Sequence, residues 1–200
     1  MAATARTRDA GKIRIIAGVF RGRKLIVPAG DLVRPTADKV REALFDILGP
    51  RVVGARFLDA CAGTGAIGIE ALSRGASVVT FVEKNREIAA HLRRNIEIVS
   101  AGQAITHTPR MTHLIVGDLT EAIPILQREN RCFDIIYLDP PYTGGQLGRA
   151  IRAICGARLM REDSLLVAEH DSKSGAPAAD GLAAIRTVVY GRTALSFFGG

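Results

Sequence analysis

The sequence predicts an α/β fold built on a seven-stranded, mostly parallel sheet with an antiparallel last strand. From Arg56 onward, short apolar runs alternate with stretches in which apolar residues recur at helical spacing. The runs are apolar at successive positions, which is typical of strands covered by helices on both faces. The last two runs are separated only by Gly191 and Arg192, so they should form an antiparallel hairpin at one end of the sheet.

The chain before Arg56 predicts a distinct N-terminal block. Residues 1–12 are small, polar and basic, and we expect a disordered tail there. Two β-rich runs, Ile13 to Ala17 and Lys24 to Val27, flank a turn rich in Gly and Arg and predict a β-hairpin. Pro35, a Thr36 cap and apolar residues at helical spacing then predict an amphipathic helix that docks on the rest. We therefore expect an extension over residues 13–48 and a main domain over residues 49–200.

The main domain alternates strands and helices. The expected helices lie near residues 65–74, 85–100, 119–129 and 146–158. The expected strands are RFLDA, SVVTFVE, HLIVGD, DIIYLD, LLVAEH, IRTVVY and TALSFF. The sequence contains no internal repeat, low-complexity block or interdomain linker, so one domain with a small appendage is expected.

Composition narrows the class of protein. The hydrophobic fraction of 48% and charged fraction of 24% are those of a globular protein, and no apolar run approaches the roughly 18 residues of a membrane span. The N-terminus has basic residues but lacks the apolar core of a signal peptide. Cys61, Cys132 and Cys155 are far apart and have no metal-ligand spacing, so neither a disulfide framework nor a metal site is expected. We expect a cytoplasmic protein.

The positive charge is concentrated at the N-terminus. Residues 1–56 hold 12 Lys and Arg against 5 Asp and Glu, whereas residues 57–200 hold 15 of each. A solvated basic face is one interpretation. A chain polarised in this way, with a pI near 9.8, is also typical of proteins that bind a phosphate-rich partner.

A glycine-rich turn follows the first strand of the main domain, in the stretch FLDACAGTGAIGIEALSRGA. Strand, turn and helix in this order place backbone amides and a helix N-terminus beside a ligand, and Gly63 and Gly65 allow a close approach. With Gly68 they also satisfy the dinucleotide pattern G-x-G-x-x-G, and Glu83 ends the next strand 20 residues after Gly63. A structural turn with incidental acids is the remaining alternative.

Asp59, four residues before Gly63, helps to decide which ligand the glycine-rich turn binds. It would repel the pyrophosphate of a dinucleotide, but it would favour the ammonium and sulfonium groups of S-adenosylmethionine. Glu83 suits either ligand, since both carry a ribose diol. Asp118 could accept from the adenine amine, but Asp118 and Glu121 also form a capping-box pattern, and both interpretations stand.

The stretch FDIIYLDPPYTGG places an acid, two prolines and an aromatic ring at the end of an apolar strand. An amine on an aromatic or amide group is a poor nucleophile because its lone pair is delocalised. The Asp139 carboxylate and the Pro140 carbonyl could hold both N–H groups and orient the lone pair, while Tyr142 offers a face for stacking. The alternative is a proline turn with Tyr142 in the core.

Several segments carry a family resemblance. DACAGTG, FVEKN and DPPY resemble the motifs of class I S-adenosylmethionine-dependent methyltransferases, which have a Rossmann-like fold with an antiparallel last strand. RIIAGVFRGRKLIVP followed by RPTADKVREALFDIL resembles the RsmD family, which methylates guanine N2 in 16S ribosomal RNA. The resemblance runs from Ile13 to the final strands. It implies an rRNA methyltransferase, acting on a guanine of the position 966 type in the small ribosomal subunit.

The resemblance implies roles for matching residues. The methionine end of the cofactor would contact Asp59, Gly63 and Gly65, with the ribose at Glu83 and adenine near Asp118. Thr36 and Arg41 would reach the cofactor carboxylate, although a helix cap and a surface charge are equally compatible with them. Asp139, Pro140 and Tyr142 would hold the guanine. The basic residues expected to grip RNA phosphates are Arg14, Arg21, Arg23, Lys24 and Arg34.

Three hypotheses remain open at this point. The first is the 16S rRNA guanine-N2 methyltransferase, and the second is the same chemistry on DNA adenine or a protein glutamine. The third is an NAD-dependent oxidoreductase, which the glycine pattern alone would allow. A monomer is expected because the sequence shows no extended apolar seam.

Overall fold

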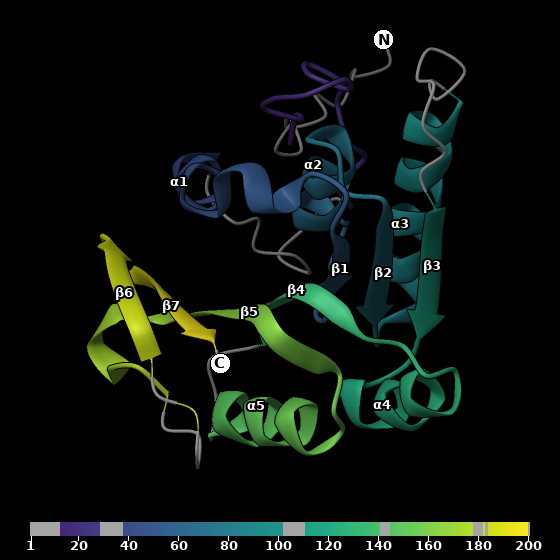
Figure 1. Cartoon of the computed structure of the whole chain (residues 1–200). Coiled ribbons are helices and arrows are strands. Elements are labelled where there is room, and N and C mark those ends of the chain that lie inside the picture. Colours follow the sequence, from purple (N-terminus) through teal and green to yellow (C-terminus); the bar gives the residue numbers. More distant parts are fainter. Residues whose placement is uncertain are drawn as a thin grey trace, which may run out of the picture.

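The computed structural model describes residues 13–28, 38–101, 111–140, 145–177, 182 and 184–199. Within them, seven strands form one sheet in the order β3-β2-β1-β4-β5-β7-β6 (Figure 1). Neighbours among the first five strands in this order are parallel, whereas β7 pairs antiparallel with both β5 and β6. The predicted sheet is therefore confirmed, including its antiparallel terminal hairpin.

The predicted alternation of strands and helices is present in the described residues. The strands are β1 (Arg56–Asp59), β2 (Val78–Glu83), β3 (Met111–Val116), β4 (Phe133–Leu138), β5 (Met160–Asp171), β6 (Ala184–Tyr190) and β7 (Thr193–Gly199). The helices are α1 (Asp38–Leu48), α2 (Ala66–Ser73), α3 (Arg86–Ser100), α4 (Leu119–Arg128) and α5 (Gln146–Gly156). Two short 3-10 turns, η1 (Gly49–Val52) and η3 (Ser172–Ser174), complete the set.

β5 begins earlier than predicted, because a polar stretch at its start still joins the sheet. The β4–β5 register shifts between Phe133 and Ile135, so that the chain bulges around residues 161–164. Ser164 is buried there, accepts a hydrogen bond from the Arg161 amide and donates one to the Phe133 carbonyl. A single buried hydroxyl therefore stabilises the bulge. The exposed charged residues beside Ser164 do not have a strand pattern, so the sequence did not predict this part of β5.

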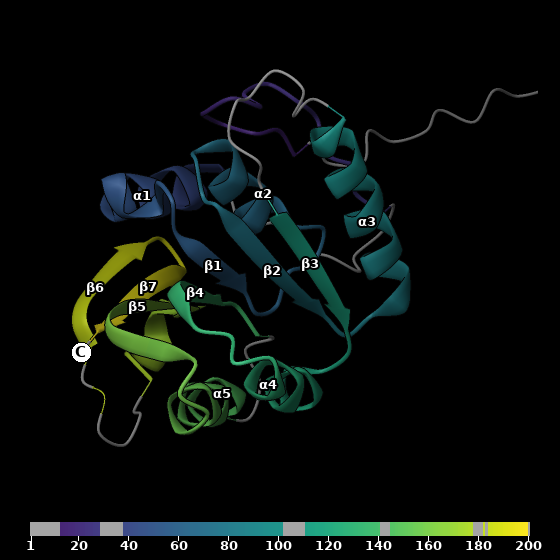
Figure 2. The ribbon, with the colours of Figure 1, turned by 45° about the vertical axis from the view of Figure 1, so that its right-hand side comes forward.

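Helices cover both faces of the sheet, as the apolar strands require. One core combines α1, α2 and α3 with the N-terminal segment over residues 13–28 and with inward residues such as Phe57 and Ile135. The second core combines α4 and α5 with the alternate strand residues, such as Leu58 and Ile136. Figures 1 and 2 show the two helical layers on opposite sides of the strands. Successive residues of the central strands thus enter different cores.

The N-terminal segment forms less of a hairpin than predicted. Its two arms meet at one antiparallel bridge between Arg14 and Lys24, flanked by hydrogen bonds such as that from the Leu25 amide to the Ile13 carbonyl, 2.8 Å. The ladder stops there because the next amides, of Ile16 and Ala17, donate to the carboxylate of Glu70 instead. The first arm therefore bonds to α2 rather than extending its pairing with the second arm.

Glu70 is the anchor of this segment. Its fully buried carboxylate accepts hydrogen bonds from the Ile16 amide at 2.8 Å, the Ala17 amide at 2.9 Å and Arg74 Nε at 2.8 Å. Arg41 Nε lies 3.9 Å from the same carboxylate. Because the donors surround the charge, the carboxylate can be buried without the full desolvation cost.

The turn between the two arms packs on the last residue of α2. The Val19 amide donates to the Ser73 carbonyl, and the Phe20 amide donates to the Ser73 hydroxyl, each at 2.9 Å. Gly18 has a φ of +80°, and a Cβ built there would lie 2.0 Å from the Ser73 carbonyl oxygen. Only glycine fits this approach, so the turn is fixed to the C-terminal end of α2.

The expected tail over residues 1–12 and the start of the docking helix, including Thr36, lie outside the described residues. None of the helices in the described part of the chain combines the length and apolar character that crossing a bilayer requires.

Replacing Glu70 by alanine should loosen the N-terminal segment from α2. The change removes the acceptor of two buried amides and leaves Arg41 with less compensating charge, so we expect a loss of about 3–5 kcal/mol in the free energy of unfolding. Urea unfolding would measure this loss. Glu129→Ala is the matched control, because Glu129 is exposed and forms a surface ion pair with Arg131; it should cost less than about 1 kcal/mol. Equal losses in both variants would contradict the anchoring role.

Candidate functional site

Acidic residues meet at the carboxyl edge of the sheet, where β2, β1 and β4 end. The parallel register aligns Asp59 of β1 with Phe81 of β2 and with Tyr137 of β4. Two positions further along, β2 ends at Glu83 and β4 is followed by Asp139. Since side chains alternate between faces, these carboxylates belong to the face covered by α1, α2 and α3.

Cys61 lies among these acids, although sequence reasoning assigned it no role. Burial, together with the charges of Asp139, Asp59 and Glu83, raises the pKa of its thiol to about 12. The backbone amide of Asp139 opposes this shift by hydrogen bonding to the sulfur. The thiol is therefore neutral, and its hydrogen bond with the Asp139 amide joins the start of the glycine-rich stretch to the segment after β4. Its position in the sequence, midway between the predicted site residues Asp59 and Gly63, could have indicated that Cys61 lies at the site.

Asp59 is buried at the base of the glycine-rich turn. Its Oδ2 accepts a hydrogen bond from the Gly68 amide at 2.9 Å, which fixes the first turn of α2 to the end of β1. Its Oδ1 is also buried and has no hydrogen-bond partner within the described residues. Burial is the main cause that raises the pKa of Asp59 to about 7; the hydrogen bond from Gly68 opposes this shift and the charge of Glu83 contributes to it. A cation beside Oδ1 would stabilise the ionised form.

The turn itself depends on two glycines in left-handed conformations. Gly63 has a φ of +54° and Gly65 a φ of +85°, and Gly65 is the residue that caps α2. A Cβ at Gly65 would lie 2.3 Å from a methyl group of Leu92. The chain can therefore turn from β1 into α2 with its backbone close to any ligand at this edge.

Glu83 holds the turn in place from the neighbouring strand. Its Oε2 accepts from the Gly63 amide at 2.8 Å and its Oε1 from the Asn85 amide at 2.7 Å. A carboxylate offers about four lone-pair positions, so the two amides leave capacity for further donors. Binding of a ribose diol by Glu83 is compatible with this geometry and stays a prediction.

Asp118 forms the predicted capping box at the start of α4. Its Oδ1 accepts from the Thr120 amide and its own amide donates to Glu121 Oε2, each at 3.0 Å. Hydrogen bonds from the amide and hydroxyl of Thr120 are the main cause of its lowered pKa. The capping interpretation is confirmed, whereas the adenine contact stays a prediction.

The segment after β4 is described only in part. Asp139 is half-buried and Pro140 is buried at the end of β4, beside Cys61. Tyr142 and the second proline lie outside the described residues, so the expected stacking face is untested. Asp139 and Pro140 are thus placed next to the glycine-rich turn, as their order in the sequence predicts.

Arg41 is not the surface charge that one interpretation of the docking helix suggested. Its side chain is 1% exposed, and its NH2 donates to the Arg14 carbonyl at 2.6 Å and to Asp38 Oδ1 at 3.0 Å. Burial is the main cause of the lowered pKa of Arg41, and the charges of Asp38 and Glu70 oppose that effect. Arg41 therefore joins α1 to the N-terminal segment; a contact with a cofactor carboxylate stays a prediction.

The predicted basic residues of the N-terminal segment are not equivalent. Arg14, Arg21 and Lys24 are exposed. Arg23 is half-buried, donates to the Ile98 carbonyl near the end of α3 at 2.8 Å and stacks on the Phe20 ring. Arg34 lies outside the described residues. Arg23 therefore has a structural role that the sequence did not reveal.

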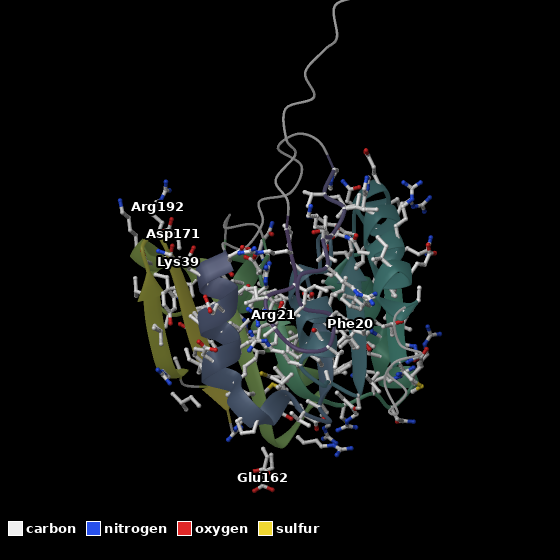
Figure 3. The ribbon with its side chains drawn as sticks, turned by 90° about the horizontal axis from the view of Figure 1, so that it is seen from above. Phe20, Arg21, Lys39, Glu162, Asp171 and Arg192 are labelled. Carbon is white, nitrogen blue, oxygen red and sulfur yellow. The ribbon has the colours of Figure 1, made fainter. Side chains whose placement is uncertain are left out.

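The turn that carries Arg21 lies away from the acidic edge. It contacts Ser73, and α2 separates that residue from the glycine-rich turn by eight residues, about 12 Å of helix. Figure 1 shows the N-terminal segment at the end of the sheet opposite to the tips of β2 and β3, and Figure 3 views that end from above, with Arg21 and Phe20 on the near side. Arg21 can thus touch only a ligand that extends well beyond the acidic edge.

Asn95 of α3 connects the N-terminal segment to the glycine-rich turn. Its Oδ1 accepts from the Ile26 amide at 2.7 Å, and its Nδ2 donates to the carbonyls of Ile26 and Thr64, each at 3.0 Å. The side chain is fully buried. Sequence reasoning missed it; one polar residue on the apolar stripe of an amphipathic helix was the available signal.

The arrangement favours a cationic ligand. Carboxylates from three adjacent strands border the glycine-rich turn, and negative charge in a poorly solvated site attracts a cation and repels a pyrophosphate. Within the part of the chain that the structure describes, no group of three or more His, Cys, Asp or Glu residues could hold a metal ion.

A family model, curated proteins and solved structures all match most of this chain. The family model named conserved hypothetical protein 95 matches residues 13–199. Ribosomal RNA small subunit methyltransferase D of Escherichia coli is 36% identical over 84% of this chain and 79% of that protein. The Bacillus subtilis protein YlbH is 33% identical over 93% of this chain and 98% of that protein. The solved structure of yhhF from Escherichia coli matches with a TM-score of 0.78 and 34% identity, over 94% of this chain and 97% of that chain.

The raised pKa of Asp59 predicts a pH-dependent stability. Between its ordinary pKa of 3.8 and about 7, the folded state binds the proton that the unfolded state has released, so the free energy of unfolding falls as pH rises. Relative to Asp59→Asn, the wild type should lose up to about 4 kcal/mol between pH 4 and pH 8. Urea unfolding of both proteins across this range measures the difference. A constant difference would show that the carboxyl group ionises normally.

Proposed function

Because the chain belongs to the RsmD family, whose model is named conserved hypothetical protein 95, we propose that it methylates N2 of a guanine in 16S ribosomal RNA, of the position 966 type, using S-adenosylmethionine. One observation carries the proposal. The glycine-rich turn and its buried acids directly adjoin Asp139 and Pro140, so a cationic methyl donor and a planar amine would meet at one edge of the sheet.

Charge favours S-adenosylmethionine over NAD as the cofactor. The sulfonium and ammonium groups would lie near Asp59, whose buried Oδ1 lacks a hydrogen-bond partner in the described chain. The two negative charges of a dinucleotide pyrophosphate would face Asp59 and Glu83 instead, at a cost that grows as the site excludes water. The oxidoreductase hypothesis is therefore the weaker one, even though the glycine spacing allows it.

The chemistry at Asp139 is one of orientation. The Asp139 carboxylate and the Pro140 carbonyl each accept one N–H of the guanine amine, which directs the nitrogen lone pair toward the methyl carbon. Bound S-adenosylmethionine would supply the methyl group: the N–C bond would form as the S–C bond breaks, and the S–C electron pair would stay on sulfur, leaving S-adenosylhomocysteine. The extra proton on nitrogen leaves to the Asp139 carboxylate and then to water. Positioning supplies most of the rate enhancement in such a site.

The remaining assignments follow the family resemblance. Glu83 would bind the ribose diol, and Asp118 would accept from the adenine amine. Thr36 and Arg41 would approach the cofactor carboxylate. Tyr142 would stack on the guanine base, which must be extruded or unpaired to reach the site.

The basic N-terminal segment supports a large RNA substrate. Arg14, Arg21 and Lys24 are exposed and could contact phosphates without reading sequence. The turn that carries Arg21 lies a helix length from the acidic edge, so such contacts require a substrate much larger than one nucleotide. This favours structured 16S RNA, in an assembling or assembled small subunit, over a glutamine side chain. DNA also carries phosphates that the basic residues could contact, so only the family resemblance argues against DNA adenine as the substrate.

Replacing Asp139 by alanine tests the chemical role. We expect kcat to fall at least a hundredfold because one amine acceptor is lost, while the affinity for S-adenosylhomocysteine stays within about threefold. Methyl transfer from labelled cofactor and calorimetric binding measure the two quantities. Asp163→Ala, at an exposed position in β5, is the control and should leave both unchanged. Unchanged transfer by the Asp139 variant would contradict the proposed mechanism.

Reversing the charges of Arg21 and Lys24 together tests the RNA contact. We expect weaker RNA binding and a shallower salt dependence, because fewer counterions are released, with cofactor affinity unchanged. Filter binding at several salt concentrations would measure this. Charge reversal at Arg128 and Arg152, exposed on α4 and α5 at the opposite face, is the matched control. Equal effects of the two pairs would show that the N-terminal segment has no special contact with RNA.

A further inference from the structure

Helix α3 connects the acidic edge to the N-terminal segment. It begins at Arg86, three residues after β2 ends at Glu83, and its 15 residues span about 22 Å. Near its other end, the Ile98 carbonyl accepts a hydrogen bond from Arg23 at 2.8 Å. Figure 2 shows α3 beside β3, extending from the tips of the strands to the N-terminal segment. A long ligand can therefore reach from one end of the molecule to the other along this helix.

The solvent face of α3 carries three arginines. Arg86, Arg93 and Arg94 are exposed, and within the described residues no acidic side chain lies at ion-pair distance from any of them. Arg86 and Arg93 are seven residues apart, so they share one side of the helix, about 10.5 Å apart along its axis. Ala90 is the exposed residue between them, and its methyl group leaves the space between the two arginines open.

The third arginine of this face lies close to the N-terminal segment. Arg94 precedes Ile98, whose carbonyl binds Arg23, by one helical turn. Arg21, on the turn that begins at Gly18, is exposed and two residues before Arg23 in the chain. The positive charge of the N-terminal segment therefore continues onto α3.

These charges do not serve the stability of α3. Positive side chains stabilise the last turn of a helix and destabilise the first, and the effect falls off within one turn. Arg86 is the first residue of α3, and the last turn of the helix contains no basic residue. Arg93 and Arg94 lie in its middle. Helix stability therefore does not explain why arginine occurs at these three positions.

The positive charge of this stretch is local. Residues 84–97 contain four Lys and Arg against the two acids Glu87 and Glu97, whereas residues 57–200 as a whole contain equal numbers of basic and acidic residues. Both acids are exposed on the same helix, so the face is positive but not uniformly so. A partner of this face should therefore be anionic and should contact the arginines individually.

An RNA backbone fits this surface better than a protein does. Protein interfaces have an apolar centre from which charged residues are depleted. Ile98, at 37% exposure near the C-terminal end, is the one large exposed hydrophobic residue of α3. A guanidinium matches the geometry of a phosphate and can bind it through two parallel hydrogen bonds.

We propose that the outward face of α3, formed by Arg86, Arg93 and Arg94, binds the phosphate backbone of the RNA substrate between the N-terminal segment and the acidic edge. The inference rests on the proposed function, because it requires an RNA substrate. It deepens that function by giving the RNA a path of contacts between Arg21 and the site, which lie at opposite ends of the sheet.

Replacing both Arg93 and Arg94 by glutamine tests this path. Binding of unmodified 16S RNA and of unmodified small subunits would be measured at several salt concentrations. Each phosphate contact that is lost should lower the slope of log K against log salt by about 0.7–0.9, so the double variant should lose about 1.5 and bind about tenfold more weakly at low salt. The KM for RNA should rise, while kcat and the affinity for S-adenosylhomocysteine stay unchanged.

Two controls separate a phosphate contact from damage to the helix. Glu97→Gln changes an exposed residue of the same helix but removes a negative charge, so it should tighten RNA binding. Glutamine at both Arg128 and Arg152, which are exposed on α4 and α5 at the opposite face, should leave the salt slope unchanged.

The possible failures are distinguishable. An unchanged salt slope in the Arg93 and Arg94 variant of an active enzyme would overturn the role of α3 and leave the proposed function standing. Weaker binding to the subunit with unchanged binding to naked RNA would show that α3 contacts a ribosomal protein, and would also overturn it. A wild type that neither binds nor methylates RNA or subunits would overturn the proposed function, and this inference with it.

Discussion

The parallel pairing of β1 with β2 and β4 is the constraint on which the site depends. Because the three strands run in one direction and in the observed register, their carboxyl ends bring Asp59, Glu83 and Asp139 to one face of one edge. Glu83 then accepts a hydrogen bond from the Gly63 amide in the turn after β1, and Asp59 accepts one from the Gly68 amide of α2. A shift of β1 by one residue would turn Asp59 into the opposite core and separate it from α2.

The N-terminal segment is built into this arrangement. Glu70 holds its first arm on α2, and Asn95 joins its second arm to the Thr64 carbonyl of the glycine-rich turn. Both contacts lie on helices that begin at the carboxyl edge. The segment that we propose contacts RNA therefore shares buried hydrogen bonds with the turn that we propose binds the cofactor. Its apolar residues also enter the same core as α1, α2 and α3.

The strands and helices of the main domain could be predicted because their apolar patterns and turns are local properties. The same holds for the Asp118 capping box, whose two acids are three residues apart. Arg41 and Arg23 could not be interpreted in this way. Their roles depend on partners 27 and 75 residues away. In each case a charge that looks solvent-exposed or unassigned in the sequence is determined by tertiary contacts.

The identity of the methylated nucleoside tests the central claim most directly. Labelled S-adenosylmethionine would be supplied with naked 16S RNA, with small subunits that lack the modification and with duplex DNA, followed by nucleoside analysis. The account predicts label in N2-methylguanosine from the RNA or the subunit and none in the DNA. Label in methyladenine of the DNA, or no transfer to RNA despite tight cofactor binding, would contradict it.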